Sequence, residues 1–73
     1  MLTKEQYLFI RNNPSVDGLP VIHSCFLVKS NIFISEEHFN VLFSKWLMST
    51  GGIHFMSRIL SISFSTLDKH FNI

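Results

Sequence analysis

The segment SEEHFNVLFSKWLMSTGG, residues 35–52, constrains the fold more than any other part of this chain. Its apolar residues recur at the spacing i, i+3, i+4, i+7 and i+8, which places them on one face of an α-helix. These residues are Phe39, Leu42, Phe43, Trp46 and Leu47. Ser35 can cap the helix, acidic residues fill its first turn, and Gly51-Gly52 can end it. The pattern therefore predicts a core helix over 36–50.

The size of the chain makes full burial of its apolar residues difficult. Its 73 residues form one domain at most, and a single cysteine cannot make a disulfide within the chain. Yet 47% of the residues are hydrophobic. We expect Phe43, Trp46 and Leu60 in the core, and the remaining apolar surface to be covered in a homo-oligomer. The predicted interface combines helix 36–50 with the segment 21–34.

The first half of the chain predicts two further elements. Thr3 and Gln6 have the spacing of a capping box, so a short helix is expected over 3–12, followed by a turn-rich connector over 14–20. The segment 21–34 is ambiguous, because short apolar runs fit either a helix or two strands joined by a turn. We favour a helix over 21–29.

The end of the chain has the spacing of a helix-turn-helix. Ser57 supplies a small residue where a second helix could cross, and Ile62 could fill the corner between the helices. Ser61–Ser63 is the expected turn, with Leu67 and Phe71 facing inward from the last helix. The predicted fold is thus an all-α domain over residues 1–73, with four to five helices and a helix-turn-helix at about 53–71.

Polar side chains on the last two predicted helices are the candidate DNA-binding residues. Serine and threonine can bond base edges or phosphates, whereas arginine, lysine and histidine can contact phosphates. The candidates are Arg58, Ser65, Thr66, Lys69 and His70. The net charge of only +1 predicts weak binding by a single subunit, because affinity grows with the number of phosphate contacts. Several subunits are therefore expected to act together.

The chain from about Leu19 to Phe71 resembles the PapB/FocB group of enterobacterial adhesin (fimbrial) transcription regulators. The shared features are Leu19-Pro20, a long helix ending in LMSTGG, and FSTL in the predicted last helix. The resemblance implies an all-helical regulator that oligomerises on AT-rich DNA and controls adhesin operons. It also implies that Arg58, Ser65, Thr66 and Lys69 face the DNA. The chain departs from the group in being shorter and less basic around its last helix.

Other classes of function find little support in the sequence. The histidines are too scattered for a zinc site, and His23-x-Cys25 is a weak metal signal beside the alternative of a partly exposed histidine next to a buried thiol. No nucleophile is marked by a neighbouring base and acid, and no glycine-rich phosphate loop is present. We therefore expect no enzymatic activity, cofactor, metal or small-molecule substrate.

The expected location is the cytoplasm, because the chain has no apolar run of membrane-spanning length and no secretory leader. One alternative to DNA binding stays open. A nearly neutral chain rich in phenylalanine also suits a small protein-interaction or inhibitor module, of the kind found among phage and plasmid accessory proteins.

Overall fold

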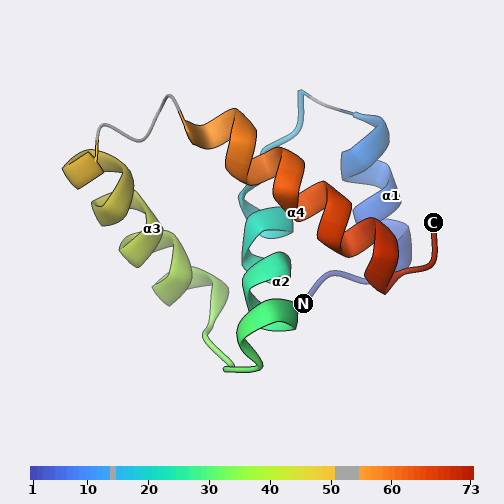
Figure 1. The fold of residues 1–73 in the computed structure, drawn as a ribbon, viewed down its shortest axis with the longest axis horizontal. Coiled ribbons are helices and arrows are strands. Elements are labelled where there is room, and N and C mark those ends of the chain that lie inside the picture. The colour runs from blue at the N-terminus through green and yellow to red at the C-terminus, as the bar shows by residue number, and fades with distance from the viewer. Residues whose placement is uncertain (14, 51–54) are drawn as a thin grey trace.

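The computed structural model describes residues 1–13, 15–50 and 55–73, which form four α-helices and contain no β-strand. The helices are α1 (Lys4–Asn12), α2 (Leu19–Ser30), α3 (Glu36–Thr50) and α4 (Met56–His70). Figure 1 shows α1, α2 and α4 packed together, while α3 stands to one side and joins α2 through the segment 31–35. The all-α prediction is confirmed.

Helix α1 begins at the predicted capping box. The backbone N–H of Gln6 donates to Thr3 Oγ1 at 3.1 Å, and the N–H of Thr3 donates to Gln6 Oε1 at 3.0 Å. These two bonds satisfy backbone donors that have no partner within the helix. The predicted helix over 3–12 is therefore confirmed, with Thr3 as its cap.

Helix α2 settles the ambiguity over 21–34 in favour of a helix, and the two-strand alternative is wrong. The helix begins two residues earlier than expected, at Leu19, because Pro20 fits the first helical turn, where an N–H is not needed. It ends at Asn31, which adopts a left-handed φ of 56°. Five consecutive residues, 21–25, are buried, so α2 contacts other elements on several sides and lacks the one-sided pattern of a surface helix.

Helix α4 corrects the predicted helix-turn-helix. Residues 56–70 form one continuous helix that passes through the expected turn at Ser61–Ser63. Ser63, which was expected in the turn, is buried within the helix, and its hydroxyl donates to the carbonyl of Ile59 at 2.8 Å. Such a bond to the preceding turn lets serine occupy a helix interior. Ile62, the expected corner residue, is 54% exposed.

The core lies between α1, α2 and α4. Tyr7, Ile10, Val21 and Leu67 are buried at its centre, and partly buried apolar residues surround them: Leu2, Val28, Leu60, Phe64 and Phe71. The predicted inward positions of Leu67 and Phe71 fit this arrangement.

The expected core role of Trp46 is wrong, because its side chain is 42% exposed, and Phe43 is only half-buried. Helix α3 has the predicted range, although the proposed stop at Gly51-Gly52 lies outside the described residues. Leu60, the third residue expected in the core, packs against its edge.

Candidate functional site

An open apolar groove lies between α2, α3 and α4, with a volume of about 520 Å³. Among the described residues that line it, Lys29 alone carries a charge. The lining consists of Ile22, Cys25, Phe26, Lys29, Phe39, Phe43, Trp46, Ile59, Ile62 and Ser63. This groove contains most of the apolar stripe that the sequence placed in the core. Concave, mostly apolar surfaces of this size are typical of binding sites.

Aromatic rings line the α3 wall of the groove in a continuous row. The ring centroids of Phe39 and Phe43 are 5.6 Å apart, and those of Phe43 and Trp46 are 5.7 Å apart. Both pairs are stacked, with interplanar angles of 13° and 26°. Phe26 extends the row to α2, 5.5 Å from Phe39. Because these rings support one another, the wall is preformed.

The base of α3 is tied to α2 through His23. Its Nε2 lies 2.7 Å from the carbonyl oxygen of Ile34, and its ring centroid is 5.2 Å from that of Phe39. His23 is buried, so the sequence-based expectation of a partly exposed histidine is wrong, whereas the expectation of a buried thiol at Cys25 is confirmed. The tie fixes where α3 leaves α2 and thus fixes one end of the groove.

The candidate DNA-binding residues divide into two sets on α4. Arg58, Ser65 and Lys69 are exposed, and their spacing of seven and eleven residues places them on one face of the continuous helix. Thr66 is half-buried beside that face. His70 is exposed, with its ring 4.9 Å from the ring of Phe71. Only Arg58, Ser65 and Lys69 form a single row on one face of α4, and the exposed Ile62 interrupts this row.

A hydrogen-bonded cluster that the sequence analysis missed joins α1 to α4. Asp68 accepts from the Tyr7 hydroxyl at 2.5 Å and from Arg11 Nε and Nη2 at 2.9 and 3.1 Å. Tyr7 also lies 3.0 Å from the carbonyl of Phe64. Because the partners are 57 to 61 residues apart in the sequence, no local sequence pattern predicts the cluster. The carboxylate of Asp68 is therefore already hydrogen-bonded within the fold.

The cluster shifts the pKa values of its members. Hydrogen bonds from Tyr7 and then Arg11 hold the pKa of Asp68 below its ordinary value of 3.8. Burial, followed by the bond to Asp68, raises the pKa of Tyr7 above its ordinary value of 10.0. Each shift favours the protonation state that the folded protein has near neutral pH.

Stability is therefore expected to fall at both extremes of pH. The contribution of ionised Asp68 is complete above its unfolded pKa of 3.8 and is lost as the pH falls through its lower folded pKa. The contribution of neutral Tyr7 is complete below pH 10.0 and is lost as the pH rises toward its higher folded pKa. Urea unfolding should show that the free energies of unfolding of the wild type and Asp68→Asn differ by a constant amount near neutrality. This difference should narrow below about pH 4. A difference in unfolding free energy that does not change with pH would contradict this role of Asp68.

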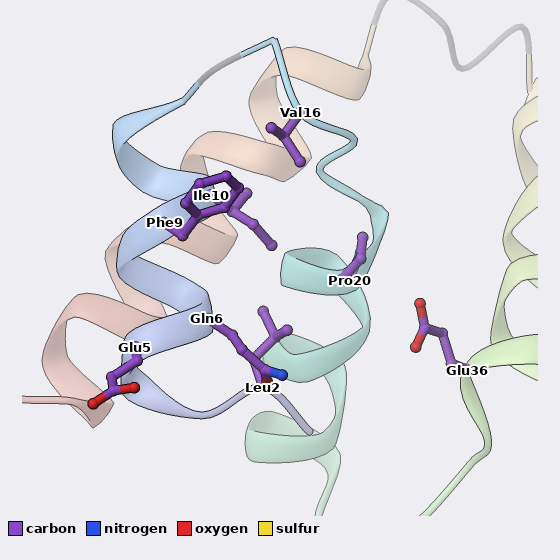
Figure 2. A pocket seen from close by; sticks show the side chains of 8 residues that line it. All are labelled: Leu2, Glu5, Gln6, Phe9, Ile10, Val16, Pro20 and Glu36. Atoms are coloured by element: carbon purple, nitrogen blue, oxygen red, sulfur yellow. The ribbon is translucent and has the colours of Figure 1, made fainter.

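A second hollow, of about 540 Å³, lies beside α1. Figure 2 shows its apolar side chains between two carboxylates, with Glu5 at one side and Glu36 at the other. The two acids lie on different helices and do not converge on a common point in the view. In the part of the chain that the structure describes, no group of three His, Cys, Asp or Glu side chains could hold a metal ion. The groove is therefore the stronger candidate site.

Comparison with known proteins gives no relative for this chain: no family model, curated protein or solved structure matches it. None of the helices within the described ranges has the length and apolar character needed to cross a membrane. The groove and the exposed face of α4 are therefore the features that indicate a function.

Proposed function

We propose that this chain is a small protein-interaction module that binds an apolar helix of a partner in the groove between α2, α3 and α4. One observation carries the proposal: a continuous aromatic wall, formed by Phe39, Phe43 and Trp46, lines an open groove on the surface. Apolar surface of this kind on a soluble domain marks an interaction site. Aromatic side chains are also enriched among the residues that dominate binding energy.

The shape and chemistry of the groove favour a helix as the bound element. Helices bind in apolar grooves through residues at i, i+3 or i+4, and i+7, which form a stripe similar to the one on α3. A helix satisfies its own backbone hydrogen bonds, so it suits an apolar lining that offers few polar partners. Lys29 is the only charged residue among the described residues that line the groove, and it would favour an acidic residue at the edge of such a stripe.

A second candidate function is DNA binding, favoured by the exposed row of Arg58, Ser65 and Lys69 on α4. In this candidate the chain is a transcription regulator, of an adhesin operon if the family resemblance holds, and several copies act on AT-rich duplex DNA. Arg58 and Lys69 would contact phosphates, while Ser65, Thr66 and His70 would lie near the bases or backbone. The continuous α4 would contact the duplex along its side, without the turn of a helix-turn-helix.

The two candidate functions differ in how strongly salt weakens binding. Trp46 is the only tryptophan of the chain, so its fluorescence emission reports on the groove. A designed amphipathic helical peptide with a leucine stripe and glutamate flanks should shift Trp46 emission to shorter wavelength. Its affinity should change little between about 50 and 200 mM salt, whereas DNA affinity falls steeply over that range. In a DNA titration, Arg58→Ala or Lys69→Ala should each reduce the salt slope by about one unit. Absence of any response to the peptide in a monomeric protein would contradict the interaction module.

A further inference from the structure

We infer that the helix bound in the groove is α3 of a second copy of this chain, lying antiparallel to the first α3 in a two-fold dimer. The inference rests on the proposed function and names the partner of that same site. In a two-fold dimer the same patch is used by both subunits, so each α3 would form one wall of its own groove and also fill the groove of its mate.

The apolar side chains of α3 suit both tasks. Leu42 lies one helical turn from Phe39 and from Trp46, so all three share one side of α3. Phe39 is buried against α2, whereas Leu42 and Trp46 remain 47% and 42% exposed. A second α3 placed against these two side chains would bury the part of the stripe that α2 does not reach.

Two cations, one on α2 and one on α4, would attract the ends of a bound α3. Lys29 is in the last turn of α2, and Arg58 is in the first turn of α4. Figure 1 shows α3 beginning beside the end of α2 and extending toward the side where α4 begins. The first turn of α3 carries Glu36 and Glu37, and its last turn carries no basic residue to offset the negative end of its dipole. Each end of a bound α3 would therefore meet a cation.

The antiparallel orientation follows from the same charges. In a parallel pair, the four carboxylates of Glu36 and Glu37 from two copies would lie together at one end and repel each other. The antiparallel pair separates them to opposite ends and also opposes the two helix dipoles.

Large apolar side chains at the groove remain available for burial in a dimer. A specific interface buries about 800 Å² on each partner, and this chain exposes 5090 Å² in total. Phe26, Trp46 and Ile62 line the groove and are still exposed, and Leu42, on the same side of α3 as Trp46, is exposed as well. Burial of these residues would remove from water part of the apolar surface that the small core leaves uncovered.

The mass in solution tests the inference. Sedimentation equilibrium at micromolar concentration should give a species of twice 8.5 kDa. Leu42→Glu should weaken the dimer by about thirtyfold or more, as expected when a charge enters the centre of an interface. Met48→Glu is the matched control. Met48 is 86% exposed and lies nine residues, or two and a half turns, from Phe39, on the opposite side of α3. This variant should remain dimeric, and circular dichroism should show that both variants are folded.

Cysteine cross-linking tests the orientation. An antiparallel two-fold pair brings the middle of the stripe next to its own copy, so Leu42→Cys in a Cys25→Ala background should oxidise to a covalent dimer. Disulfides require Cα atoms about 4.4–6.8 Å apart. Met48→Cys is more exposed and should react less, because it faces away from the mate. Equal cross-linking of the two variants would overturn the proposed geometry.

The outcomes separate this inference from the proposed function. A monomeric wild type that still binds the designed peptide at Trp46 would overturn the self-pairing and leave the groove as a protein-binding site. A monomer without a peptide response would overturn both. A dimer that Leu42→Glu leaves intact would place the interface elsewhere and overturn the inference.

Discussion

Replacing Tyr7 with alanine is expected to remove a large part of the protein's stability. Tyr7 has no exposed surface, and its ring lies 5.3 Å from that of Phe71 and 6.1 Å from that of Phe64. Truncation of a buried aromatic residue costs about 3–5 kcal/mol, whereas small domains are stable by only about 5–15 kcal/mol. The change also removes the hydroxyl that donates to Asp68. Urea unfolding followed by circular dichroism would measure the loss.

Tyr7→Phe separates the contribution of the Tyr7 hydroxyl from that of the ring, and Trp46→Ala tests the position of the core. Tyr7→Phe keeps the ring and removes one hydrogen bond to a charged acceptor, so it should cost about 1.5–3 kcal/mol. Trp46→Ala removes a larger side chain from the groove wall and should cost less than Tyr7→Ala, because Trp46 lies outside the core. If Trp46→Ala were the more destabilising change, the position of the core would be wrong.

The contrast between Tyr7 and Trp46 shows what the sequence could predict about the core. The stripe from Phe39 to Leu47 correctly predicted the helix and its apolar face. A periodic pattern does not show whether another element covers that face. Here α4 packs mainly against α1 and α2, so Trp46 is left at the groove. Tyr7 is central because of partners 57 and 61 residues away, which no local pattern reveals.

The candidate site could be predicted only in part. The stripe on α3 gave one wall of the groove, but the other walls depend on how α2 and α4 cross, and this is set by tertiary packing. Arg58, Ser65 and Lys69 were correctly expected at the surface. Their alignment in one row was not expected, because it requires α4 to continue through Ser61–Ser63.

The turn was predicted at Ser61–Ser63 because the apolar spacing before and after it fits two short helices as well as one long helix. In the long helix, Leu60, Phe64, Leu67 and Phe71 follow the spacing i, i+4, i+7 and i+11 and share the side that packs on the core. Serine has only a modest helix propensity, yet Ser63 bonds the carbonyl of Ile59 and stays in the helix. Burial of that apolar side therefore outweighs the local preference for a turn.

Substitutions at Ser61 test whether α4 is continuous in solution. Ser61 is exposed, so changes there report on the backbone and disturb little packing. In a helix interior, alanine should be the most stable replacement, glycine should be about 1 kcal/mol worse, and proline about 3 kcal/mol worse. Proline removes the N–H that pairs with the carbonyl of residue 57 and clashes with that carbonyl. In a helix-turn-helix, Ser61 would start the turn in a left-handed conformation, and glycine would then be more stable than alanine. Urea unfolding of the three variants gives their order of stability directly. A glycine variant more stable than the alanine variant would contradict the continuous helix and support a turn at Ser61.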